Sequence, residues 1–236
     1  MIYKTNNFEL SADYWTIDYK NRVEIEDAQA ILNQDPNGSS ITRTESGDLI
    51  GVTTQYFNED RTDLKGLDLS ATSIFNFKDL GELSINLEAT HLIEFLTPEL
   101  QNQSQGSSMI NRVGKFNYDS PTHALPRNRI NLFVNWYVDG YEHVFNTRYV
   151  DSYKTLRSIN SLAQSLGYEN KIDSFLVFDW CLKSKTQGDE RVFGGSMEIG
   201  FCIINLTDEK PPRLYDAPDF SFDTRVHDPR GRIFQI

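Results

Sequence analysis

The chain contains the run Leu83-Ser84-Ile85-Asn86-Leu87-Glu88-Ala89-Thr90. Apolar side chains occupy every second position of this run, and polar side chains fill the positions between them. Because successive side chains of a β-strand point to opposite faces of its sheet, the run predicts a strand with one apolar and one polar face. The predicted strand continues to about Phe95.

The same alternation recurs along much of the chain. It covers Ile130 to Val138, after which Asp139-Gly140 gives a tight-turn signal and the chain returns through Phe145, Thr147 and Tyr149. Helical spacing appears over Ser158 to Gly167 and predicts a short helix within a loop. In total we predict about eight strands, at residues 6–26, 54–77, 82–96, 128–138, 141–153, 172–184, 192–206 and 230–236.

The connections between these strands alternate in length. Short turns are predicted at residues 79–81, 139–140 and 186–189, and long polar stretches at residues 97–126, 154–171 and 207–229. An up-and-down barrel with short turns at one end and long loops at the other produces this rhythm, whereas a Greek-key sandwich spaces its long connections less regularly. We therefore predict an all-β fold, an antiparallel up-and-down transmembrane β-barrel segment. The stretch 27–53 is expected to hold a small hairpin with Ser46-Gly47-Asp48 at its tip.

Composition agrees with a β-protein that meets a membrane without a spanning helix. Hydrophobic residues make up 39% of the chain and the mean hydropathy is −0.49, and no apolar run approaches the roughly 20 residues that a spanning helix needs. Aromatic residues make up 12%, which suits the aromatic girdles of a barrel but also any other sheet. The net charge of −11 argues against a nucleic-acid partner, since that surface needs clustered Lys and Arg.

Five motifs resemble those of TonB-dependent outer-membrane receptors. They are Lys65–Ala71, Leu125-Pro126-Arg127 leading into Asn131 and Trp136, Arg148–Tyr153, Asn205-Leu206-Thr207-Asp208 followed by Pro211-Pro212, and His227-Asp228-Pro229-Arg230-Gly231-Arg232. They occur in the family's order over about residues 65–236, with Thr207 where the family usually has Phe. The first 60 residues fit more loosely, through Tyr14, Trp15, Ile17 and Tyr19.

The resemblance implies a barrel of about 22 strands filled by an N-terminal plug. It also implies uptake of a small nutrient ligand, such as a siderophore, a vitamin or a carbohydrate, across the outer membrane of a Gram-negative bacterium. We expect residues 1–236 to be the C-terminal portion of such a receptor, in contact with outer-membrane lipid. We further expect that the signal peptide, the plug, the TonB box and the N-terminal strands are absent from this chain. Coupling to the TonB complex would then need the missing plug, and the chain alone would not transport.

No catalytic, cofactor or metal site is evident, so an enzyme is not expected. The sequence has no G-x-S-x-G, P-loop or G-x-G-x-x-G motif. The histidines are widely spaced and in no metal-ligand pattern, so we expect structural roles for His91, His123, His143 and His227. We interpret Cys181 and Cys202 as buried or lipid-facing thiols, which would pair only if their strands are neighbours.

Two functional alternatives remain open at the level of sequence. The polar stretch Gln101 to Asn117 would contact a polar ligand outside the cell, or would be a solvated loop without ligand. The rival to the barrel is a soluble all-β module that recognises carbohydrate through Trp15, Trp136 and Trp180. The two folds differ in their apolar faces, which meet lipid in a barrel and each other in a sandwich.

Overall fold

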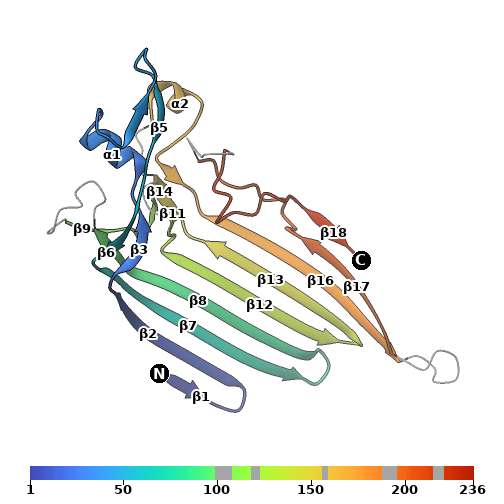
Figure 1. Cartoon of the computed structure of the whole chain (residues 1–236). Coiled ribbons are helices and arrows are strands. Elements are labelled where there is room, and N and C mark those ends of the chain that lie inside the picture. The colour runs from blue at the N-terminus through green and yellow to red at the C-terminus, as the bar shows by residue number, and fades with distance from the viewer. Residues whose placement is uncertain (99–107, 118–122, 156–158, 188–195, 215–220) are drawn as a thin grey trace.

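A computed structural model describes residues 1–98, 108–117, 123–155, 159–187, 196–214 and 221–236. One ten-stranded antiparallel sheet dominates it, and successive long strands lie side by side in chain order (Figure 1). The strands of this sheet are β1 (Ile2–Lys4), β2 (Phe8–Tyr19), β7 (Thr62–Phe77), β8 (Gly81–Pro98), β12 (Asn128–Val138), β13 (Tyr141–Val150), β16 (Phe175–Gln187), β17 (Ser196–Ile204), β18 (Ile233–Gln235), and β9 (Met109–Asn111), which pairs with β8. The predicted up-and-down β-fold is confirmed, and the described sheet is open, with β1 and β18 at its edges.

Several predicted strands match the structure closely, and others divide in two. The strand predicted at 128–138 agrees with β12 to the residue, and Asp139 and Gly140 take the positive φ values of 52° and 81° that a two-residue turn requires. The strand predicted at 6–26 instead ends at Tyr19, because Asn21 adopts a left-handed φ of 56° and redirects the chain. The predicted turn at 186–189 extends outside the described residues.

Beyond this break, the chain between β2 and β7 forms a projecting arm. A two-stranded ribbon of β3 (Arg22–Ile25) and β6 (Tyr56–Glu59) forms its base. Further out lie helix α1 (Ala28–Gln34), capped by the Asp27 side chain, and the hairpin of β4 (Ile41–Arg43) and β5 (Leu49–Val52). The hairpin prediction is confirmed, with Gly47 at its tip at a φ of 92°, whereas α1 was not predicted because it is too short to show a period.

The register of the ladders separates apolar from polar side chains. Directly opposed positions share a face, so Leu10, Ala71, Leu87 and Leu132 form one row across four strands. We call the face that carries this row the apolar face. The adjacent row belongs to the opposite, polar face, and its members are Ser11, Ser70, Glu88, Asn131 and Arg148. The alternation quoted from residues 83–90 therefore extends across the sheet.

A second, small sheet lies at the long-loop end of the strands. It contains β11 (His123–Ala124), β10 (Lys115–Asn117), β14 (Tyr153–Thr155) and β15 (Lys171–Ile172), with β10 and β14 parallel. Its core consists of Phe116, Ala124, Tyr153, Ile172 and Leu214, with Val226 packed against it. The predicted loop helix is confirmed as α2, although it is shorter, at Ser161–Ser165. The prediction of long polar stretches is incomplete in the described part, because residues 97–126 contribute Phe116 and Ala124 to this core and residues 207–229 contribute Leu214. The stretch 154–171 also buries two apolar side chains, Ile159 and Ala163.

The cysteines form a disulfide, so their interpretation as thiols is wrong. Cys181 of β16 and Cys202 of β17 are direct register partners, and their Cα atoms are 4.1 Å apart. Directly opposed residues of an antiparallel ladder come close enough for such a bond. Both side chains lie on the polar face, in step with Asp179.

In the described part of the chain, no helix has the length and apolar character needed to cross a membrane.

We predict that the disulfide stabilises the β16–β17 pair. It closes a separation of 21 residues, for which chain entropy gives about 3 kcal/mol. The double variant C181S/C202S should lower the free energy of unfolding by that amount in denaturant titrations of the detergent-solubilised protein. Reduced and alkylated wild type is the control and should match the variant. Quantitative maleimide labelling of both cysteines before reduction would contradict the assignment.

Candidate functional site

The polar face contains a shallow depression of about 360 Å³ across β2, β7, β8 and β12. Its lining residues are Ser11, Asp13, Asp68, Leu69, Ser70, Glu88, Ala89, Thr90, Arg129 and Asn131. Most of them belong to two adjacent cross-strand rows of the polar face, which explains how residues so distant in sequence meet. Carboxylates, hydroxyls, an amide and one guanidinium provide the polar groups of its lining.

Hydrogen bonds within the depression leave part of its polar surface available. Thr90 donates to an Asp68 carboxylate oxygen at 2.8 Å, and Ser11 donates to Asp13 at 2.9 Å. The Arg129 guanidinium has no hydrogen bond or ion pair within the described part of the chain. Such a wall can bind water, a polar ligand or a polar protein surface. It has no paired nucleophile and base for bond-making chemistry.

The outer boundary of the apolar face is set by a β-bulge. The register between β7 and β8 shifts at Lys65/Gly66, so that Lys65 lies opposite Glu94 and Gly66 opposite Leu92. The Lys65 ammonium and Glu94 carboxylate form an ion pair of 2.9 Å. Asp63, two residues before Lys65 in β7, lies on the same side of the sheet and pairs with Arg61. The apolar face thus changes into a charged surface at this level.

Aromatic rings form a row on the apolar face towards the short-turn end. Ring centroids are 5.4 Å apart for Trp136 and His143, 6.2 Å for His143 and Trp180, and 6.3 Å for Trp180 and Phe201. Phe234 continues the row, with its centroid 6.4 Å from that of Phe201. The Trp136 indole donates to the Leu80 carbonyl at 2.8 Å. An apolar band bounded by a charged level and an aromatic row is the pattern of a membrane-facing barrel wall.

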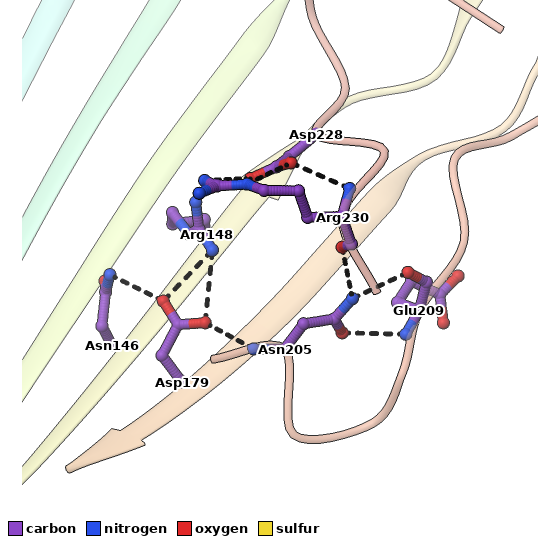
Figure 2. Close-up of polar contacts among 7 residues, drawn as sticks. All are labelled: Asn146, Arg148, Asp179, Asn205, Glu209, Asp228 and Arg230. Atoms are coloured by element: carbon purple, nitrogen blue, oxygen red, sulfur yellow. Dashed lines mark hydrogen bonds and ion pairs between the residues drawn. The ribbon is translucent and has the colours of Figure 1, made fainter. Parts of the chain in front are cut away.

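A polar cluster at the long-loop end attaches the C-terminal part of the chain to the polar face (Figure 2). The buried Asp179 carboxylate, 8% exposed, forms an ion pair with Arg148 at 3.1 Å and accepts hydrogen bonds from Asn146 and the Asn205 backbone. Asn205, at a φ of 55°, exchanges hydrogen bonds with Glu209 through its side chain. Asp179 therefore determines where the chain leaves β17.

Arg230 and Asp228 form the second half of this cluster. The Arg230 guanidinium contacts the Asp228 carboxylate at 2.7 Å, and its hydrogen bonds hold the pKa of Asp228 below its usual range. The Arg230 carbonyl accepts a long hydrogen bond of 3.5 Å from Asn205. Asp208 accepts a hydrogen bond from the backbone of Arg232 at 2.9 Å. The motifs at residues 205–212 and 227–232 are therefore hydrogen-bonded to each other.

Comparison with known proteins now identifies the family. The model of the TonB-dependent receptor-like β-barrel matches residues 2–180. The chain belongs to this family. The match includes three of the five motifs, whereas those at 205–212 and 227–232 lie beyond it. No curated protein matches the chain.

A solved structure agrees with the TonB-dependent receptor-like barrel fold. The crystal structure of the outer membrane transporter YddB from Escherichia coli aligns with a TM-score of 0.55 and 15% sequence identity. The alignment covers 98% of this chain and 30% of that structure. The chain therefore spans less than a third of the length of that transporter.

The family-like motif at Lys65–Ala71 has a clear structural role in this barrel segment. Trp15 lies directly opposite Gly66 on the polar face, and its six-membered ring occupies the space where a Cβ on residue 66 would lie. Glycine at this position therefore lets the indole pack against the β7 backbone. Sequence reasoning missed this contact, because nothing in the local pattern connects residues so far apart.

A buried ionic group at the base of the arm was also not predicted. Arg22 contacts Glu24 at 2.9 Å and Glu59 at 2.7 Å, and Thr62 donates a hydrogen bond to Glu59. Burial raises the pKa of Glu24, with Arg22 opposing this shift and Glu59 adding to it. Two carboxylates sharing one guanidinium hold the β3–β6 ribbon to the start of β7.

The histidines predicted to be structural lie in separate places. His91 hydrogen-bonds Asn128 at 2.7 Å on the apolar face, and His143 belongs to the aromatic row. His227 is 2% exposed at the long-loop end, and its amide donates to the Asp223 carbonyl. The side chain of His123 lies outside the described residues. No three His, Cys, Asp or Glu side chains converge as metal ligands within the described ranges.

The proposed ligand loop and the proposed tryptophan platform both need correction. Residues 101–107 of the Gln101–Asn117 stretch lie outside the described ranges, but Arg112, Phe116 and Asn117 are buried, at 1%, 4% and 0% exposure. Residues 112–117 are therefore not a solvated loop, because they are largely buried and residues 115–117 form β10 of the second sheet. Met109, in contrast, is exposed. Trp15 lies on the polar face and Trp136 and Trp180 on the apolar face, so the three do not form one sugar-binding surface.

We predict that G66A destabilises the barrel, because the added methyl overlaps the Trp15 ring. The expected loss in the free energy of unfolding is roughly 1–3 kcal/mol, as for overpacking elsewhere. G200A is the matched control, since its Cβ would be 3.6 Å from the Lys183 Cγ, an ordinary contact. Urea titration of the solubilised protein measures both, and W15L should rescue G66A. Equal stability of the two glycine variants would rule out the packing role.

A second prediction concerns Asp179. D179A removes the acceptor for Arg148 and Asn205, so the attachment of residues 205–209 should weaken by roughly 1–3 kcal/mol. Hydrogen exchange at the Asn205 and Glu209 amides reports this directly. N135A, another polar-face change on β12, two strands away in the sheet, is the control and should leave both amides protected. Unchanged protection in D179A would show that Asp179 does not anchor this segment.

Proposed function

We propose that residues 1–236 form the C-terminal barrel portion of an outer-membrane receptor for TonB-dependent nutrient uptake. The observation that carries the proposal is the division of one antiparallel sheet into two chemically different faces. The apolar face ends at a charged level on one side and carries an aromatic row towards the other. Lipid suits that face, and an aqueous lumen suits the opposite one.

In this proposal the polar depression is part of the lumen wall. Carboxylates, hydroxyls and the Arg129 guanidinium line it, and they offer hydrogen bonds to a plug surface or to a passing polar nutrient. The nutrient would be a siderophore, a vitamin or a carbohydrate. The wall binds and guides, and no bond is made or broken there. The plug and the TonB contact belong to parts of the receptor other than these residues.

The orientation of the faces is tested with a photo-reactive benzophenone side chain in place of Trp136, Trp180 or Trp15. In outer membranes that contain the receptor, irradiation should give lipid adducts at positions 136 and 180, because these side chains leave the apolar face. Position 15 is the internal control and should give none, because it lies on the polar face. Lipid adducts at position 15 alone, or a monodisperse protein soluble without detergent, would overturn the proposal.

We also predict that residues 1–236 alone do not transport. The sheet has two open edges, and each unpaired backbone group in lipid costs several kcal/mol. Exported to the outer membrane without the rest of the receptor, this segment should support no uptake of a radiolabelled ferric siderophore, vitamin B12 or maltodextrin. The full receptor, assayed with the same three compounds, is the comparison. Uptake by the segment alone would show that it closes a barrel by itself.

A further inference from the structure

His227 is a buried titratable group for which neither the barrel wall nor transport gives a role. Its ring lies between two aromatic side chains, nearly parallel to Tyr153 at 6.0 Å and edge-on to Phe175 at 5.2 Å. Tyr153 and Phe175 are themselves 1% and 5% exposed. Neither ring nitrogen of His227 has a hydrogen-bond partner of good geometry within the described residues. A neutral imidazole leaves one N–H and one acceptor nitrogen unpaired here, whereas an imidazolium leaves two N–H donors and a buried charge, which costs much more free energy.

The charged and titratable groups around His227 come from three elements. Asp223, 4% exposed, lies on the same loop and accepts hydrogen bonds from the Tyr153 hydroxyl of β14 at 3.0 Å and from the Arg225 amide. Arg129 of β12 is close enough to act on His227 electrostatically, and Phe175 of β16 adds no charge. The Asp223 carboxylate therefore already accepts hydrogen bonds from other donors.

The loop around His227 leads directly into the last strand. The His227 amide donates to the Asp223 carbonyl at 3.0 Å, and Asp228 and Arg230 follow in the polar cluster. Arg232 then binds Asp208 just before β18 begins at Ile233. We call residues 221–232 the lead-in segment. His227 lies on the buried side of this segment. Its burial therefore helps to hold the segment at the long-loop end.

We propose that His227 is an acid-sensitive latch, whose protonation releases the lead-in segment from the core of the second sheet and loosens the approach to β18. Two observations support this proposal. Aromatic rings enclose His227, and neither of its ring nitrogens has a hydrogen-bond partner of good geometry within the described residues. An imidazolium has two N–H donors, and only opening of the loop brings water to both. This regulation of the loop end is separate from transport and does not require it.

The direction of the pH effect follows from the two states of the loop. Burial lowers the pKa of His227 from 6.5 to about 4, with Asp223 opposing the shift and Arg129 adding to it. In the open loop the ring regains an ordinary pKa of about 6.5. The open state therefore binds the proton more tightly, so closure is strongest above pH 6.5 and weakens as the pH falls towards about 4.

Hydrogen exchange of the amides of Arg225 and His227, in the full receptor in nanodiscs, tests the latch. After correction for the intrinsic exchange rate, the opening equilibrium should be about 25-fold larger at about pH 5 than at about pH 7.5. H227F keeps a ring in the enclosure without a titrating group and should remove this difference. H227Q is a second neutral variant and should do the same if H227F perturbs the fold.

H143F is the matched control, since it changes a histidine that also packs between aromatic rings. It should keep the 25-fold difference of the wild type, to within about a factor of two. Wild-type amides with equal protection at both pH values would overturn the proposal. So would a pH dependence that persists unchanged in H227F and H227Q. Because the readout is exchange, the result is independent of whether the receptor transports any given nutrient.

Discussion

Pairing of backbone hydrogen bonds between neighbouring antiparallel strands is the constraint on which the rest of this structure depends. Once two strands pair in a given register, every side chain is assigned to one face, since a shift of one residue would exchange the faces. Six successive ladders from β2 to β17 keep the same assignment. The apolar band, the polar depression and the position of the disulfide are all consequences of that register.

The loop end obeys a different constraint. There the chain leaves the ladder, and polar groups hold its position through buried side-chain bonds. Asp179 anchors Asn205, and Arg22 holds two carboxylates at the base of the arm. Backbone pairing thus orders the barrel wall, whereas side-chain hydrogen bonds and ion pairs order the loop end of the same chain.

Much of the barrel wall could be predicted from sequence, because its information is local. Alternation over residues 128–138 is sufficient to place β12, and Asp139-Gly140 is sufficient to place its turn. The second sheet could not be predicted, since Phe116, Tyr153, Ile172 and Leu214 come from four separate segments with no period. The Trp15–Gly66 contact and the Cys181–Cys202 pair depend on inter-strand register, which alternation alone leaves open. His227 was recognised only as part of a motif, and its burial depends on the second sheet.

The order of strands in the large sheet also restricts what can complete it. From β1 to β18 the described path contains nine strands, each antiparallel to the next, so the two edge strands run in the same direction. Two copies with the same orientation in the membrane, joined edge to edge, would therefore place parallel strands at each seam. Closure with antiparallel seams throughout requires an odd number of additional strands. Self-association in one orientation is thus a poor route to a closed barrel. A different polypeptide segment that contributes an odd number of strands can close it with antiparallel pairs throughout.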